Sequence, residues 1–168
     1  MQTYRIVVGV DGSEGGQRAL TWAVAEAQRR GGTVQAIIAW ALTPPQFGAE
    51  VRADREDVAR QALDQAIAVA RRGYPDVAVA AEVAAGPAAE VLTGAATDAD
   101  LLVLGSHGHG RLFHAVVGSV AEHCIRAAVC PVVVVPVPHL VMPPAEPTGR
   151  TRRADHHRHL LTPRRGTR

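Results

Sequence analysis

The chain has 168 residues, 47% of them hydrophobic, which is enough for one domain with a substantial core and a tail. No run approaches the roughly 20 apolar residues of a membrane span, and the first residues, MQTYRIVVGV, lack the features of a secretion signal. We therefore expect a cytoplasmic protein. All 18 basic residues are arginines, which excludes sites that require a lysine, such as a Schiff base or a Walker-type phosphate contact.

Charge divides the chain into two parts. Residues 1–138 carry 11 arginines and 14 acidic residues, a net charge of −3, whereas residues 139–168 carry 7 arginines and 2 acidic residues, a net charge of +5. We predict a nucleotide-binding domain over 1–138 and a basic, disordered tail over 139–168, because the second part has four prolines and no lasting periodicity. No aromatic residue interleaves these arginines, so a solubilising tail is favoured over binding to nucleic acid or lipid.

In the first half of the chain, strand and helix patterns alternate. Residues 4–10 predict a short buried strand, and Ser13 is placed to cap a helix that ends at Gly31-Gly32. The apolar face of that helix is Leu20, Ala23, Val24 and Ala27. Residues 33–40 predict the second strand and 41–49 a loop. The next helix carries the stripe Val51, Val58, Ala62, Leu63, Ala66, Ile67 and Ala70.

The second half continues the alternation. Residues 77–84 predict a strand, and Gly86-Pro87 opens a helix with the proline at its first position. Residues 101–104 and 132–135 predict two more strands, separated by a helix marked by Val116, Val120, Cys124 and Ala128. This order predicts an α/β protein with one doubly wound parallel sheet, ordered 2-1-3-4-5 or 3-2-1-4-5. Cys124 and Cys130 lack the spacing of a zinc site or a disulfide framework, which indicates buried free thiols.

The loop after the fourth predicted strand is rich in glycine. Gly105, Gly108 and Gly118-Ser119 would let a ligand approach the backbone, and the N-terminus of the following helix favours an anion. These residues predict a phosphate site, to which Ser119 could donate its hydroxyl. Asp11, after the first strand, could accept from ribose hydroxyls or hold Mg²⁺, or could be a turn residue that satisfies local amides. Neither a Walker loop nor the dinucleotide fingerprint is present.

Longer stretches carry a resemblance to a known family. IVVGVDGS at 6–13, ADLLVLGSHGHG at 99–110 and GSVAEHCIRAAVCPVVVVP at 118–136, with the Gly105-x2-Gly108-x9-Gly118-Ser119 spacing, resemble the ATP-binding branch of the universal stress proteins. The resemblance covers residues 3–137. It implies a sheet ordered 3-2-1-4-5 with ATP lying across its first and fourth strands.

The resemblance also assigns expected roles. It implies that Asp11 contacts the ribose or the metal, that Ala39 or Trp40 bounds the adenine, and that the phosphates are held by Gly105, Gly108, Gly118 and Ser119. It further implies a homodimer through the last strand, Val132 to Val137, which is an apolar edge. Many relatives carry an arginine where His107 stands, so phosphate binding here is expected to be weaker or pH-dependent.

The remaining loop residues are less informative. His107, His109 and His114 could contact phosphate when protonated, but their spacing is not a recognised metal-ligand set, which favours exposed loop histidines. Arg111 could approach a terminal phosphate or be solvated.

The predicted function is a regulatory stress-response switch that binds ATP with Mg²⁺ and hydrolyses little or none, since no clear general base or lysine is available. The alternatives are a slow magnesium-dependent ATP hydrolase or phosphotransferase that uses Asp11, and an interaction module that binds no nucleotide.

Overall fold

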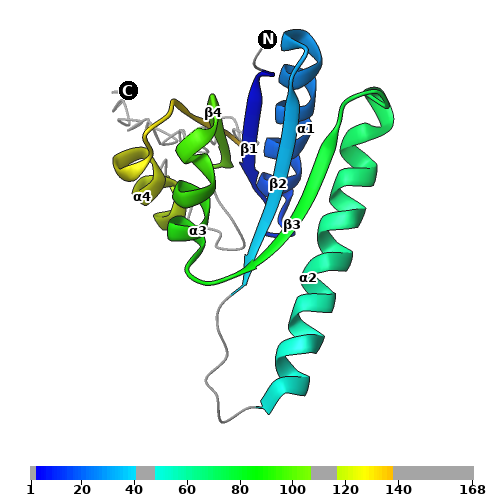
Figure 1. Ribbon diagram of the computed structural model, residues 1–168, viewed down its shortest axis with the longest axis vertical. Coiled ribbons are helices and arrows are strands. Elements are labelled where there is room, and N and C mark those ends of the chain that lie inside the picture. The colour runs from blue at the N-terminus through cyan, green and yellow to red at the C-terminus, as the bar shows by residue number, and fades with distance from the viewer. Residues whose placement is uncertain (1–2, 41–47, 107–116, 138–168) are drawn as a thin grey trace, which may run out of the picture. The chain divides into compact units, whose positions relative to one another are not determined.

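The computed structural model describes residues 3–40, 48–106 and 117–137. Over these residues, strands and helices alternate along the chain (Figure 1). The strands are β1 (Arg5–Gly9), β2 (Thr33–Trp40), β3 (Val79–Ala85), β4 (Leu101–Gly105) and β5 (Val132–Val135). The helices are α1 (Glu14–Arg30), α2 (Gly48–Ala70), α3 (Ala88–Ala95) and α4 (Ser119–Ala127), and short 3-10 turns follow α2 at Arg71–Gly73 and α3 at Ala96–Asp98.

The five strands form one parallel sheet ordered β3-β2-β1-β4-β5. Alternate residues of β1 enter two different cores: Ile6 and Val8 pack with α1 and α2, whereas Val7 packs with α3 and α4. The sheet is therefore covered by a pair of helices on each face, as Figure 1 shows. The predicted α/β class is confirmed, and of the two strand orders the second is the correct one.

Helix α1 follows the sequence prediction closely. The Ser13 hydroxyl accepts from the N–H of Gly16 at 3.1 Å and caps the helix start, and Gly31 ends it in the left-handed conformation with φ of 61°. The four predicted apolar positions, Leu20, Ala23, Val24 and Ala27, are all fully buried. This helix is packed along β1 and β4 and fixes the β1–α1 turn beside the end of β4.

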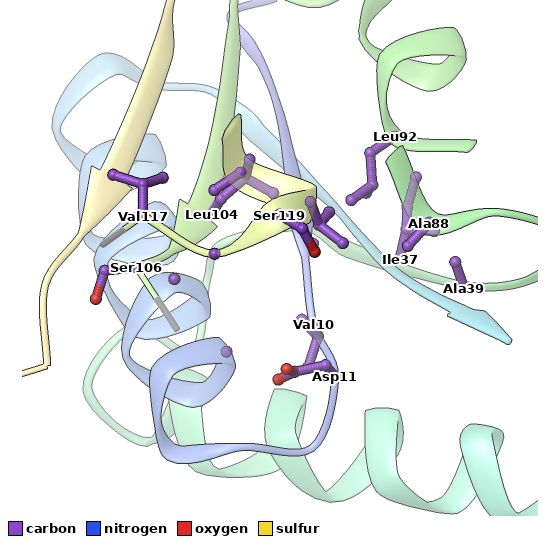
Figure 2. A pocket seen from close by; sticks show the side chains of 16 residues that line it. Val10, Asp11, Ile37, Ala39, Ala88, Leu92, Leu104, Ser106, Val117 and Ser119 are labelled. Carbon is purple, nitrogen blue, oxygen red and sulfur yellow. The ribbon is translucent and has the colours of Figure 1, made fainter. Parts of the chain in front are cut away.

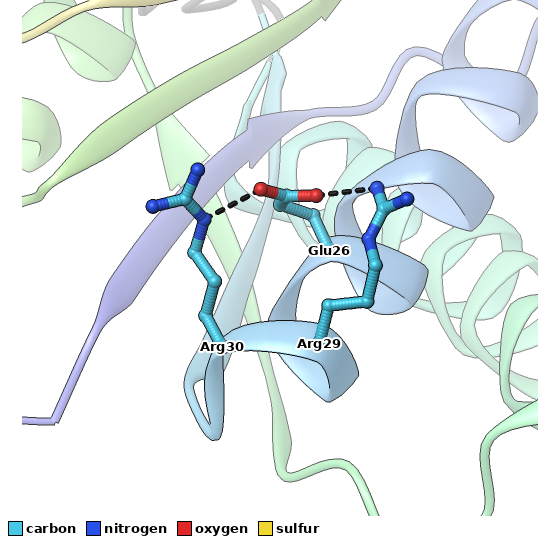
Figure 3. Close-up of polar contacts among 3 residues, drawn as sticks. All are labelled: Glu26, Arg29 and Arg30. Carbon is cyan, nitrogen blue, oxygen red and sulfur yellow. Dashed lines mark hydrogen bonds and ion pairs between the residues drawn. The ribbon is translucent and has the colours of Figure 1, made fainter.

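Among the residues whose burial the structure describes, one charged side chain is buried, at the other end of α1 (Figure 3). Glu26 is 8% exposed, and its carboxylate accepts from the Arg29 guanidinium and, at 2.5 Å, from Arg30 Nε. The Arg30 guanidinium also lies 4.6 Å from the centre of the Tyr4 ring, just before β1. The hydrogen bond from Arg30 is the main reason that the pKa of Glu26 falls below its usual value.

Two of the predicted helical stripes are partly wrong. In α2 the buried positions are Ala59, Leu63, Ala66 and Ala70, whereas Val58 is 66% exposed. Val58 lies one position away from the buried stripe, and all of residues 53–58 are exposed, because the first part of the helix extends past the sheet (Figure 1). The side chain of Val51 lies outside the described part of the structure.

In α4 the buried residues are Ala121 and Cys124, three positions apart, and Val120 is 37% exposed. Ala128 follows the end of the helix, and Val116 lies outside the described residues. Pro87 is the N-cap of α3 rather than its first helical residue, so that prediction was wrong by one position.

Both cysteines are free, as predicted, but only Cys124 is fully buried, and Cys130, two residues before β5, is half-buried. Burial is the main cause that raises the pKa of both thiols, which favours their protonated form. Among the described helices, none combines the length and the apolar character that crossing a membrane requires. Residues 139–168, predicted as a tail, lie outside the described residues.

Candidate functional site

A cavity of about 480 Å³ lies at the carboxyl ends of β1 and β4. In the strand order observed, this is where the connections from neighbouring strands diverge, because β1 leads to α1 on one face and β4 to α4 on the other. The cavity is lined by residues of the end of β1, the turn that follows it, the first turn of α1, β2, α3, the end of β4 and the first turn of α4. Its size is within the range of pockets that bind small molecules.

Asp11 lies in the wall that the β1–α1 turn contributes (Figure 2). Its Oδ1 accepts from the backbone N–H of Ser13 at 3.0 Å and from the Ser13 hydroxyl at 2.5 Å. The same Ser13 hydroxyl oxygen accepts from Gly16 at the start of α1. Asp11 is therefore a turn residue that accepts from local groups, as one of the two interpretations predicts, and it is also part of the cavity wall. Its hydrogen bonds to Ser13, the residue that caps α1, hold the carboxylate in one orientation.

Gly105 ends β4 in contact with the start of α1. A Cβ atom at this position would lie 2.7 Å from the carbonyl carbon of Gly15 and 2.8 Å from its oxygen, which no side chain tolerates. Gly105 also lines the cavity. The glycine therefore lets two loops that are far apart in sequence approach each other at backbone distance, and this contact builds one corner of the site.

Ser106 connects three segments. Its carbonyl accepts from the N–H of Gly118 at 2.8 Å, so the start of α4 is fixed beside the end of β4. Its N–H donates to Val135 O at 2.9 Å, and its hydroxyl accepts from Val137 N at 3.3 Å, both at the end of β5. The position of the cavity wall is thus linked to the edge of the sheet.

The first turn of α4 forms the polar wall of the cavity with Gly118, Ser119, Val120 and Ala121. Gly118 is the N-cap, and it has no side chain that could accept from the N–H groups of the first turn. Together with the helix dipole, this arrangement favours an anion at this wall.

The opposite wall is apolar and contains residues that the sequence analysis did not select. Ile37 of β2 and Ala88 and Leu92 of α3 lie here, and Gly9 of β1 and Leu104 of β4 also line the cavity. The sequence signals at these positions are those of an ordinary core. Only the fold shows that their side chains end at a cavity.

The structure brings together five of the eight predicted site residues: Asp11, Ala39, Gly105, Gly118 and Ser119 all line the cavity. Trp40 is not among the lining residues, and its carbonyl accepts from the N–H of Gly86 at 2.9 Å. His107 and Gly108 lie outside the described residues, as do His109, Arg111 and His114.

The residues present fit a magnesium ion that would be bound by the Asp11 carboxylate together with the phosphate oxygens of a ligand. Asp11 is the one acidic residue among the described lining residues, and the described part of the chain holds no group of three or more His, Cys, Asp or Glu side chains suited to a metal. Mg²⁺ commonly uses one or two carboxylates together with phosphate oxygens and water. A site of this kind depends on the phosphate ligand.

Sequence comparison places these features in a family. The model of the universal stress protein family matches residues 3–136. A universal stress protein of Mycobacterium tuberculosis strain H37Rv is 35% identical over 133 residues, which cover 77% of this chain and 44% of the relative. The chain thus spans less than half the length of the curated relatives that it matches.

Solved structures share the fold. A universal stress protein in complex with cAMP is 24% identical and superimposes with a TM-score of 0.63, covering 79% of this chain and 96% of that one. The universal stress protein of Archaeoglobus fulgidus in complex with dAMP is also 24% identical, with a TM-score of 0.60 and coverage of 80% and 98%. The family match over nearly all of the described residues confirms the resemblance at the level of the family, and this chain belongs to the universal stress protein family.

Proposed function

We propose that this protein binds ATP with Mg²⁺ in the cavity between β1 and β4 and acts as a regulatory switch with little or no hydrolysis. The observation that carries the proposal is the pairing of two different walls in one cavity. The first turn of α4 and Asp11 suit phosphates and a metal, and the aliphatic residues of β2 and α3 suit a base.

Two relatives support an adenine nucleotide as the ligand. The structural neighbours described above were solved with cAMP and with dAMP, which share an adenine base and a phosphate. ATP is the finer proposal, and it rests on the resemblance of the glycine motif to the ATP-binding branch of the family. The proposed ligands of the phosphates are Gly105, Gly108, Gly118 and Ser119, with His107 beside them.

Weak hydrolysis follows from the groups that line the cavity. Asp11 is the one carboxylate among the described lining residues, and its Oδ1 already accepts two hydrogen bonds from Ser13. A general base must be free to take a proton from the attacking water. The magnesium ion, when bound, would neutralise phosphate charge, while the chain itself would position the nucleotide and limit the approach of water.

A route from the cavity to the sheet edge supports the switch. Ser106 lines the cavity and is hydrogen-bonded to the end of β5 through both its N–H and its hydroxyl. In the proposal, Val132 to Val137 pair with the same strand of a second copy, so that occupancy of the cavity alters the geometry of the dimer. Residues 139–168 serve as a solubilising tail to this domain, which acts in the cytoplasm.

Calorimetric titration of the nucleotide-stripped protein with ATP and Mg²⁺, with a parallel assay for released phosphate, tests the proposal. We expect saturable binding with turnover close to background. The absence of binding would overturn the proposal and favour an interaction module.

Asp11 in the cavity wall favours a second candidate, a slow ATP hydrolase or phosphotransferase. Turnover clearly above background that is lost in Asp11→Ala would establish the enzyme instead of the switch.

A further inference from the structure

We propose that the start of α3 is the wall that contacts the nucleotide base, and that Ala88 determines which ligands fit. This inference rests on the proposed function, because it assigns one end of the cavity to the base of the bound nucleotide. Ala88 and Leu92 are one helical turn apart, so their side chains lie on the same face of α3, and both line the cavity.

Backbone contacts fix the start of α3 beside β2. Gly86 N donates to Trp40 O at 2.9 Å, and Gly86 has φ of 142°, a conformation that side chains rarely permit. Pro87 then occupies the N-cap position of α3. Ala88 lies two residues after Gly86, whose N–H is hydrogen-bonded to the end of β2. The start of α3 is therefore held beside the sheet by a backbone hydrogen bond.

The position of the Leu92 side chain is fixed by its contact with β1. The side chain is 4% exposed, and a Cβ atom built on Gly9 would lie 2.8 Å from Leu92 Cδ1. Leu92 therefore packs directly on the backbone at the end of β1 and forms a buried floor. Ala88, one turn nearer the helix start, is half-buried and carries only a methyl group.

The two ends of the cavity differ in chemistry. Figure 2 shows Leu92, Ala88, Ile37 and Ala39 grouped on one side of the view, away from Ser106 and Val117. Ile37 and Ala39 are two residues apart on β2 and present the same face. A flat aromatic base would exchange water for aliphatic surface on this side, while its phosphates reach the first turn of α4.

In this proposal, the side chain of Ala88 limits the width of the cavity on the side where the base binds. A larger side chain at this position tests the proposal. Ala88→Leu adds three carbon atoms on the cavity side of the helix. Glu90→Leu is the matched control, because it places the same side chain in an exposed position of the same turn. Calorimetry with ATP and with inorganic tripolyphosphate, each with Mg²⁺, would be performed on the 168-residue chain and both variants, after circular dichroism has verified that they fold.

We expect Ala88→Leu to weaken ATP binding on the order of tenfold or more, as overfilling of a packed site does. Binding of tripolyphosphate should stay within about twofold of that of the unsubstituted protein, since the α4 wall is unchanged. Glu90→Leu should bind both ligands as the unsubstituted protein does. Unchanged ATP affinity in Ala88→Leu, or an equal loss of both ligands, would overturn the inference while leaving the proposed function in place.

A second measurement covers the case in which Ala88→Leu does not fold or tripolyphosphate binds too weakly to measure. In methyl-labelled, unsubstituted protein, the ring current of the base should shift the Leu92 methyl resonances when ATP is added. Leu20, fully buried under the opposite face of the sheet, is the internal control. ATP binding without a Leu92 shift overturns this inference, whereas failure to bind ATP at all overturns the proposed function.

Discussion

Gly105 has a packing role that the glycine motif alone does not reveal. The motif predicts a glycine that lets phosphate approach, and the structure shows that the backbone of Gly15 occupies the space where a side chain would be. Since Gly15 lies in the first turn of α1, this close contact holds the two halves of the site together. A glycine in a binding motif can thus be required by the fold before any ligand is bound.

We predict that Gly105→Ala destabilises the protein by about 1–3 kcal/mol, because the new Cβ forces the end of β4 away from Gly15. Urea unfolding followed by circular dichroism measures the change. Gly94→Ala is the control, since a Cβ there meets nothing within 4 Å and the position is helical. It should be neutral or stabilise by up to about 1 kcal/mol. Equal stabilities of the two variants would contradict the packing role of Gly105.

Asp11 gives a prediction about the metal. Asp11→Asn keeps the shape of the side chain and an oxygen that accepts from Ser13, but removes the charge. If Mg²⁺ joins this carboxylate to the phosphates, ATP affinity should fall about tenfold with Mg²⁺ present, as is common when the surroundings of a metal are disturbed. Calorimetry with Mg²⁺ and with EDTA separates the effects, and the exposed Asp98→Asn serves as control. An equal loss in EDTA would rule out the metal role.

At the scale of the element, α1 is stabilised at its C-terminal end by the Glu26 cluster. Because the arginines lower the pKa of Glu26, the folded state gains stability when this carboxylate is ionised. That contribution is present above the usual pKa of 4.5 and is lost as the pH falls through the lower pKa of the folded state. The cluster therefore stabilises the protein at neutral pH and not in acid.

Glu26→Gln is expected to lower the thermal midpoint at pH 7, with a difference from the unsubstituted protein that shrinks below pH 4.5. Differential scanning calorimetry across this pH range measures it. Glu122→Gln is a matched control, because Glu122 pairs with Arg126 at 2.6 Å in an exposed position of α4, where ion pairs contribute little. A pH-independent loss for Glu26→Gln would show that packing rather than charge is responsible.

The elements differ in how far their sequence predicts them. The strands and α1 are long enough or apolar enough that burial alone defines them, and the β2 and β5 bounds match the predicted residues. The apolar stripes of α2 and α4 are poor predictors of burial, because not every apolar residue on these two helices faces the core. Val120 is partly exposed where it lines the cavity, and Val58 belongs to the exposed stretch 53–58 of α2.

At the scale of the whole molecule, sequence predicts the half of the cavity that follows β1 and β4. Gly105 and Gly118-Ser119 belong to a recognisable glycine spacing, Asp11 directly follows the first predicted strand, and the fold brings them together. The α3 wall could not be predicted in this way. Ala88 and Leu92 are apolar helix residues like many others, and their position at a cavity depends on the depth at which α3 packs against Gly9.

The proposed dimer makes a prediction about the sheet edge. Leu102 N donates to Pro131 O and Ser106 N to Val135 O, so the odd-numbered residues of β5 face β4 and Val134 directs its N–H outward. Val134→Pro should therefore convert a dimer to a monomer while the fold persists, because proline is tolerated on edge strands. Light scattering after size-exclusion chromatography measures the mass. Val83→Pro, at the β3 edge, should remain dimeric, and a dimer in both variants would exclude pairing through β5.

The hydrogen bond between Gly118 and Ser106 has a consequence for evolution. It holds Ser106 and Gly118, which lie on either side of positions 107–116 in the sequence, next to each other. Since the entropy of closing a loop grows only slowly with its length, insertions and exchanges between these anchors would cost the folded state little. Ligand preference at this site can therefore diversify between lineages while the core remains unchanged, and the same anchors offer protein engineers a place to graft a new recognition loop.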